Sequence, residues 1–170
     1  FAEELAEDGA DVVLVSGPTN ISSEKKNIKL IRVTSADEMF SSCTKEFKHA
    51  DCAILSAAVA DFKPKEFSSE KIKKSDKKFS IELEKTKDIL KQLGDVKKKN
   101  QLLIGFALET EKEMENAKKK LKEKNLDAII LNSLRDDGAG FQHDTNKISI
   151  INKNKIISFD KKPDRKSTRL

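Results

Sequence analysis

Aromatic residues and cysteines are scarce in this sequence of 170 residues. Aromatic residues make up 5% of the sequence, and all of them are phenylalanine, because tryptophan and tyrosine are absent. We therefore expect a core built mainly from aliphatic side chains. The two cysteines, Cys43 and Cys52, are too few for a disulfide framework and lack the paired spacing of metal ligands, which suits a reducing, cytoplasmic compartment.

Long apolar runs and an excess of one charge are also lacking. No stretch approaches the roughly 18 to 20 apolar residues of a membrane-spanning helix, and no signal-peptide pattern is present. The 34 basic residues are offset by 29 acidic ones, which leaves a net charge of +5. Nucleic-acid binding favours basic residues that no acids oppose on one face. We therefore expect neither a nucleic acid nor a membrane as partner.

The sequence does contain a regular alternation of apolar runs and helical patterns. Apolar runs that predict strands lie at residues 12–15, 28–33, 102–108 and 128–131, and a further run ends at Leu55. Helical patterns lie at residues 1–8, 35–47, 88–94 and 111–124. Residues 79–84 alternate like a half-exposed strand, and the runs at 148–151 and 156–159 predict a hairpin. The alternation predicts an α/β fold with a Rossmann-like, three-layer open sheet, mostly parallel, with an antiparallel C-terminal hairpin.

The length and the absence of repeats or linkers predict one domain over residues 1–163. A chain of 19.1 kDa is large enough for a single core. Because the chain begins at Phe1, without Met and inside a helical pattern, we expect it to be cut from a longer protein. The polar segment 164–170 fits no element and is expected to be a disordered or foreign tail.

Small residues follow the apolar run that ends at Leu55. Where a buried strand ends in small side chains such as Ser56 and Ala57, a ligand can approach the backbone. The charged segment after Pro64 predicts a loop whose lysines could lie over that strand end. The Lys71–Lys74 pattern alone carries no weight, because 34 basic residues produce it about once by chance.

Six motifs occur in a fixed order along almost the whole chain. They are LVSGPT at 14–19, AAVADFKP at 57–64, KIKK at 71–74, DIL at 88–90, GFALET at 105–110 and NLDAIILN at 125–132. In this order and spacing they resemble phosphopantothenate cysteine ligase (phosphopantothenoylcysteine synthetase) of coenzyme A biosynthesis, and KIKK resembles its bacterial, CTP-using form. The strand and loops with which that family opens are absent here, as is the flavin-dependent decarboxylase to which the bacterial ligase is usually fused.

The resemblance implies a two-step reaction. The carboxylate of 4′-phosphopantothenate attacks the α-phosphate of CTP, pyrophosphate leaves, and the amine of L-cysteine displaces CMP from the acyl-cytidylate to form an amide. Cationic side chains and Mg²⁺ suit such anionic substrates. The resemblance also implies a homodimer, and it places FMN only in the decarboxylase part. Without the family's opening strand and loops, we expect this chain alone to bind ligand weakly and to turn over nothing.

The resemblance implies roles for residues around the strand that ends at Leu55. Lys71 matches a lysine tied to turnover of the acyl-cytidylate and is the expected catalytic and nucleotide-binding residue. Leu55, Ser56 and Ala57 match positions whose backbone contacts the nucleotide, and Ala57 also matches a contact to the pantothenate. Asp61 matches an acid at the nucleotide. An acid beside a triphosphate requires sugar hydroxyls, base amino groups or a metal in front of it.

Further along the chain, a helix start and an aromatic residue match the family's nucleotide site. The helix-start segment consists of Lys87, Asp88, Ile89 and Leu90, where free backbone N–H groups could bind a base edge or an anion. The family usually has Asn-Pro before this Asp, and this chain has Thr86-Lys87. Phe106 matches the aromatic residue. A plain N-cap for Asp88 and core packing for Phe106 are the structural alternatives.

Two lysines lie at the margin of the helix predicted over residues 111–124. At about 100° per residue, Lys124 projects within roughly 20° of the apolar residue Ala117, and Lys120 lies one turn earlier. Two ammonium groups stacked there suit a phosphate or a ribose, and both lysines match nucleotide-binding positions of the family. The alternative is that they lie along the surface among the neighbouring lysines.

Two other functions remain open from the sequence. A nicotinamide-dependent oxidoreductase would need a Gly-x-Gly-x-x-Gly turn, which none of the visible strand ends provides. A basic RNA-binding module would need aromatic residues interleaved with lysine, whereas phenylalanine here is sparse and lies mostly in apolar runs.

Overall fold

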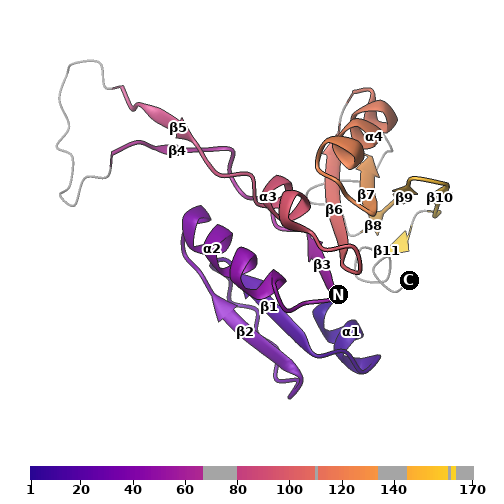
Figure 1. Cartoon of the computed structure of the whole chain (residues 1–170), viewed down its shortest axis with the longest axis horizontal. Coiled ribbons are helices and arrows are strands. Elements are labelled where there is room, and N and C mark those ends of the chain that lie inside the picture. Colours follow the sequence, from indigo (N-terminus) through magenta and orange to yellow (C-terminus); the bar gives the residue numbers. More distant parts are fainter. Residues whose placement is uncertain (67–79, 110, 134–144, 161, 164–170) are drawn as a thin grey trace.

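A computed structural model of the chain describes residues 1–66, 80–109, 111–133, 145–160 and 162–163 (Figure 1). A five-stranded sheet has the order β10-β9-β7-β6-β3. Its strands are β3 (Cys52–Leu55), β6 (Leu102–Glu109), β7 (Ala128–Ser133), β9 (Ile148–Asn152) and β10 (Ile156–Ser158). β3, β6 and β7 are parallel, whereas β9 runs antiparallel to β7 and to β10. The predicted α/β fold, with a mostly parallel sheet and an antiparallel C-terminal hairpin, is confirmed.

The first two strands form a separate parallel pair. β1 (Val12–Ser16) and β2 (Ile28–Arg32) are in register from Val12 and Ile28 to Ser16 and Arg32. Among the described residues, β1 pairs only with β2, and β3 pairs only with β6. The parallel strands are therefore divided between two sheets.

The helices in the described part of the chain are α1 (Ala2–Glu7), α2 (Ala36–Phe47), α3 (Ile89–Val96) and α4 (Glu113–Glu123). Two of them, α2 and α3, begin at side-chain caps. Ser35 caps α2 by accepting a 3.2 Å hydrogen bond from the Glu38 amide, and the Glu38 carboxylate accepts a 2.6 Å hydrogen bond from the Thr34 amide. Just beyond α1, Gly9 has a φ of +93°, a conformation that favours glycine.

One face of the five-stranded sheet is sealed by α3 and by the residues that follow α4. A Cβ at Gly105 would lie 2.7 Å from the Leu90 side chain and 3.2 Å from that of Leu126, so the helical layer touches the β6 backbone. Leu103 on the same face is completely buried, as is Leu126. Each such side chain contributes about 1.5–3 kcal/mol through burial.

The same core extends to the β1–β2 side of the molecule. Phe47 of α2 and Val33 just after β2 belong to one buried cluster with Leu93 and Leu103. The two sheets therefore share one apolar interior. On the opposite face of β6, Phe106 is only half-buried and packs edge-to-face against Phe1, with ring centroids 5.6 Å apart.

The sequence patterns predicted only part of two short strand pairs. β4 (Phe62–Pro64) and β5 (Leu83–Lys85) form an antiparallel arm that extends away from the rest of the chain (Figure 1). Residues 79–84 predicted a half-exposed strand, but β5 is shorter and its side chains are all exposed, because the arm has no core beside it. β8 (Thr145–Asn146) pairs with β11 (Lys162–Pro163), and two-residue strands carry no periodic signal. No helix in the described part of the chain has the length and apolar character needed to cross a membrane.

Candidate functional site

The carboxyl end of β3 exposes small residues, as the sequence predicted. Leu55 is half-buried and lies beside Gly105 in the register with β6. Ser56 and Ala57, which follow it, are exposed. The Ala57 carbonyl accepts a 3.1 Å hydrogen bond from the Val59 amide, which closes a tight turn. The backbone of Ser56 and Ala57 is therefore open to a ligand at this sheet edge.

This turn is joined to the start of α3. The Thr86 amide donates to the Asp61 carbonyl at 2.9 Å, and the Thr86 hydroxyl donates to the Ala60 carbonyl at 2.6 Å. Two segments that are 25 residues apart in the sequence are thereby fixed side by side, with the exposed carboxylate of Asp61 beside them. The structure thus brings the predicted residue Asp61 next to the predicted segment that begins at Lys87.

Asp88 connects the start of α3 to the end of α4. Its Oδ1 accepts a 2.9 Å hydrogen bond from the Lys91 amide, which makes it the N-cap, and its Oδ2 lies 2.7 Å from Lys124 Nζ. Burial raises the pKa of the Asp88 carboxyl, but hydrogen bonds from Lys124 and from the Lys91 amide, with both lysine charges, outweigh this and hold the pKa below its ordinary value. Asp88 is therefore an N-cap that also holds a predicted nucleotide-binding lysine.

The next two residues of α3 contribute their side chains to the core. Ile89 is buried, and Leu90 packs against Gly105. Only their backbone N–H groups, at the first turn of the helix, could serve a ligand. Because the first N–H groups of a helix lack intrahelical partners and carry the positive end of its dipole, this position suits an anion or a base edge.

Lys120 is held by a residue that the sequence analysis missed. Its Nζ lies 2.6 Å from Glu109 Oε1, at the carboxyl end of β6 and one helical turn before Lys124. Both predicted lysines of α4 are therefore paired with carboxylates from other elements. Such long-range pairs leave no local pattern in a sequence, so only the fold could reveal Glu109.

Lys87 points toward α2 rather than toward Lys124. Its Nζ lies 5.0 Å from the centroid of the Phe40 ring and 3.8 Å from Asp37 Oδ1. Asp37 also forms an ion pair with Lys63 of β4, and the hydrogen bond from Lys63 lowers the pKa of the Asp37 carboxyl. Asp37 therefore anchors the root of the β4–β5 arm on α2.

One predicted residue, Phe106, is not brought into this group. The side chain of Phe106 lies on the face of β6 opposite to Leu90, against Phe1, which fits the core-packing alternative. Lys71, the expected catalytic residue, lies outside the described residues and stays a prediction.

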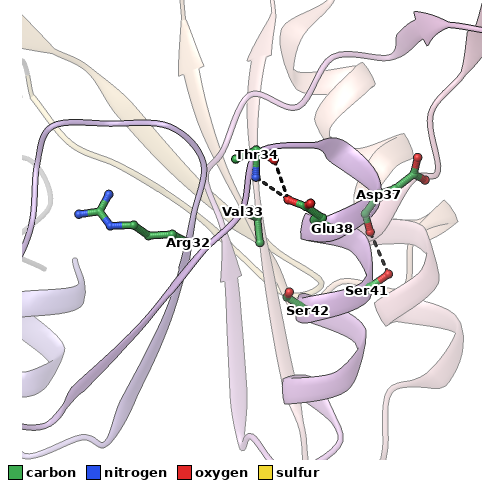
Figure 2. A pocket seen from close by; sticks show the side chains of 7 residues that line it. All are labelled: Arg32, Val33, Thr34, Asp37, Glu38, Ser41 and Ser42. Carbon is green, nitrogen blue, oxygen red and sulfur yellow. Dashed lines mark hydrogen bonds between the residues drawn. The ribbon is translucent and has the colours of Figure 1, made fainter. Parts of the chain in front are cut away.

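An open depression of about 590 Å³ lies beside α2 (Figure 2). None of the predicted residues that the structure describes lines it, although Asp37 in its lining lies 3.8 Å from Lys87 Nζ. Its lining consists of Arg32, Val33, Thr34, Asp37, Glu38, Ser41 and Ser42. Figure 2 shows the Glu38 carboxylate hydrogen-bonded to Thr34 at the helix start, and Arg32 directed away from α2, where it donates to the Thr19 carbonyl at 3.1 Å. Two carboxylates, Asp37 and Glu38, line the depression, and Arg32 is directed away from α2, so we do not assign a ligand to it.

No cluster of three or more His, Cys, Asp or Glu side chains suitable for a metal ion occurs among the residues that the structure describes. The chemistry available at the carboxyl edge of β3 and β6 is instead exposed backbone, a helix start and two lysines, each paired with one carboxylate. This combination suits an anionic ligand.

Known proteins have similar sequences and a similar fold. The family model for the DNA/pantothenate metabolism flavoprotein C-terminal domain matches residues 1–169. A cysteine/cysteine sulfinic acid decarboxylase from an unknown prokaryotic organism is 51% identical over 163 residues, which are 95% of this chain and 45% of that protein. The coenzyme A biosynthesis bifunctional protein CoaBC of Bacillus subtilis (strain 168) is 44% identical over 151 residues, which are 89% of this chain and 37% of that protein.

A solved structure supports the same assignment. The crystal structure of the C-terminal domain of a coenzyme A biosynthesis bifunctional protein CoaBC has a TM-score of 0.75 and 37% sequence identity, and the match covers 93% of this chain and 69% of that one. The chain spans less than half the length of the two curated relatives described above. From its sequence match and its fold, the chain belongs to the family of the DNA/pantothenate metabolism flavoprotein C-terminal domain.

Proposed function

We propose that this chain is the nucleotide-binding part of a ligase of coenzyme A biosynthesis, which joins 4′-phosphopantothenate to L-cysteine at the expense of CTP. Its family membership and its similarity to the Bacillus subtilis protein named for coenzyme A biosynthesis support the pathway. The observation that carries the proposal is the 2.7 Å contact between Lys124 and Asp88, which holds an ammonium group at the start of α3.

Three features of this position favour a triphosphate. The N-terminal end of α3 and the Lys124 ammonium are both positive and attract an anion, and the Asp88 carboxylate that contacts both offsets only part of this charge. An ammonium group has three donors, and the bond to Asp88 uses one of them. Lys120, one turn earlier on the same helix, supplies a second ammonium group. A phosphate chain lying along this side of α4 would meet both.

The proposed chemistry needs binding and charge stabilisation rather than a protein nucleophile. A carboxylate oxygen of phosphopantothenate forms a bond to the α-phosphorus of CTP as the bond to pyrophosphate breaks. The cysteine amine then attacks the acyl carbon, loses a proton, and releases CMP. Lys120 and Lys124 would hold phosphates, the backbone at Ala57 would contact both substrates, and Lys71 would stabilise the reacting centre.

A divalent cation such as Mg²⁺ would neutralise phosphate charge. Because Mg²⁺ in such sites is held mainly by substrate phosphates, water and one or two carboxylates, a single exposed acid such as Asp61 fits this role. Alternatively, Asp61 would accept hydrogen bonds from the ribose hydroxyls or from an amino group of the base.

We extend the proposal to the organisation of the protein. Residues 1–163 would form one ligase domain, residues 164–170 a tail outside it, and the active form would be a homodimer. FMN would belong to a fused decarboxylase part. One relative is named for decarboxylation, and the match covers 45% of it, compared with 37% of the Bacillus subtilis protein. Amino-acid decarboxylation needs no triphosphate, whereas the paired lysines of α4 suit one, so we prefer the ligase.

Because the chain alone is expected to bind ligand weakly, titration with nucleotide up to millimolar concentration tests the proposal. Lys124→Met should weaken binding of CTP with Mg²⁺ by about tenfold, because a charge-assisted contact contributes roughly 1.5–3 kcal/mol. The matched control is Lys118→Met, which removes an exposed lysine from the same helix and should leave binding within about twofold. Calorimetric titration with CTP, and separately with ATP, measures the affinity of each variant. Equal losses in the two variants would contradict the proposed site.

A further inference from the structure

The carboxyl end of β6 presents a carboxylate that α4 holds through both oxygens. Glu109 is the last residue of β6, and its side chain is only 14% exposed. Its Oε1 lies 2.6 Å from Lys120 Nζ, and its Oε2 accepts a 3.2 Å hydrogen bond from the Asn116 side-chain amide. The carboxylate is therefore fixed in position and largely shielded from water.

Asn116 makes this arrangement rigid. The same amide nitrogen donates a 2.9 Å hydrogen bond to the Glu111 carbonyl, in the connection that leads from β6 to α4. The backbone amide of Asn116 bonds to the Lys112 carbonyl at 2.9 Å, within the first turn of α4. The side chain of Glu109, at the end of β6, is thus held by Lys120 and Asn116 of α4, and Asn116 in turn binds the connection between β6 and α4.

Lys120 differs from its partner in exposure. Its side chain is 43% exposed, so part of it faces solvent while its ammonium group is tethered to Glu109. One of the three ammonium donors serves Glu109, and the others are open to a ligand. A lysine that is already restrained loses less side-chain entropy when a ligand binds.

We propose that Glu109 is a positioning residue for Lys120, which it holds at the carboxyl edge of the sheet in the orientation that binds a nucleotide phosphate. This inference rests on the proposed function and adds Glu109 to it, as a residue that acts on the nucleotide only through Lys120. Asp88 holds Lys124 in the same way one turn along α4, which makes two tethered lysines on one helix.

Removal of Glu109 has two opposing effects on an anionic ligand. It removes a negative charge, which favours binding, and it frees Lys120, which disfavours binding. Because Lys120 and Asn116 already compensate that charge, the loss of orientation should prevail. We therefore expect Glu109→Gln to weaken binding of CTP with Mg²⁺ roughly three- to tenfold.

The first measurement needs no nucleotide. Acylation of lysines, read by mass spectrometry, should be roughly threefold or more faster at Lys120 in Glu109→Gln than in the unchanged chain, because an ion-paired ammonium group reacts less readily. Labelling at Lys118 should not change. Glu111→Gln is the matched control, because it removes an exposed acid from the same connection and should leave Lys120 as it was.

The second measurement is a double-mutant cycle of Glu109→Gln with Lys120→Met, read by calorimetric titration with CTP and Mg²⁺. If Glu109 acts through Lys120, the Glu109 change should cost nothing further once Lys120 is Met. A purely structural Glu109 would give additive losses instead. Circular dichroism confirms folding, and Glu109→Asp, which keeps the charge but shortens the side chain, replaces Gln if that variant fails to fold.

The outcomes separate the inference from the proposed function. Unchanged labelling of Lys120 in a folded Glu109 variant overturns the inference whether or not a nucleotide binds. Tighter CTP binding by Glu109→Gln, or additive losses in the cycle, also overturns it. Failure of the unchanged chain to bind CTP even at millimolar concentration overturns the proposed function, and the labelling result then decides whether Glu109 holds Lys120.

Discussion

At the scale of single residues, Asp88 performs two tasks that can be separated by substitution. It caps α3 through the Lys91 amide and it pairs with Lys124. Asparagine is as good an N-cap as aspartate but cannot form the ion pair, whereas alanine loses both interactions. We expect Asp88→Asn to lower the free energy of unfolding at pH 7 by about 0.2–1 kcal/mol, because the pair is partly exposed. Asp88→Ala should cost about 1–2 kcal/mol.

The Asp88 contribution should also depend on pH. Because its folded-state pKa lies below the ordinary value of 3.8, the stabilisation is present above that value and is lost as the pH falls through the folded-state pKa. Urea unfolding of the unchanged chain and of Asp88→Asn should therefore differ at pH 7 and converge only when the pH falls below the folded-state pKa, which itself lies below 3.8. Asp95→Asn, which removes an exposed acid of α3 paired with Lys91, is the control. A difference that persisted unchanged at low pH would show that the ion pair is not its source.

At the scale of elements, the space around three glycines shows how closely neighbouring segments of the chain pack against one another. A Cβ at Gly94 would lie 1.9 Å from the Lys124 carbonyl oxygen, which is backbone and cannot move aside cheaply. A Cβ at Gly105 would lie 2.7 Å from a methyl group at the end of the flexible Leu90 side chain, and one at Gly17 would lie 3.8 Å from Met39. We expect Gly94→Ala to destabilise most, by about 3 kcal/mol or more, Gly105→Ala by about 1–2 kcal/mol, and Gly17→Ala hardly at all.

Thermal and urea unfolding of the three glycine variants would check this order. Gly94→Ala should also weaken CTP binding beyond its effect on stability, because it displaces the residue that carries the Lys124 ammonium. A Gly17→Ala variant as unstable as Gly94→Ala would contradict the packing argument, since its Cβ enters an ordinary van der Waals contact.

The elements that the sequence predicted are those with a strong local cause. The cap at Ser35 and the apolar run of β6 act over a few residues, and both lie where the patterns indicated. The β4–β5 arm was missed in part, because its strands pair with each other and not with a core. The site shows the same division. The helix pattern predicted Asp88 as an N-cap and the family resemblance predicted it as a site residue, but Glu109 was found only through its contact with Lys120 across 11 residues.

At the scale of the whole molecule, the question is whether two sheets make one cooperative unit. β1 and β2 form their own sheet, yet Phe47 and Val33 share a buried cluster with Leu103 of the larger sheet. A continuous core couples its parts, since loss of either side exposes apolar surface of the other. The chain should therefore unfold in a single transition despite its divided strands.

The absence of tryptophan makes this testable with single probes. Phe40→Trp reports on α2, and Phe159→Trp reports on the end of the C-terminal hairpin, and both positions are half-buried, so the larger ring needs little rearrangement. Fluorescence during urea unfolding should give the same midpoint and the same m value at both probes, because a two-state chain exposes all its surface together. An earlier transition at the Phe40 probe would show that the β1–β2 side unfolds separately. Circular dichroism of each variant, compared with the unchanged chain, is the control for the substitutions themselves.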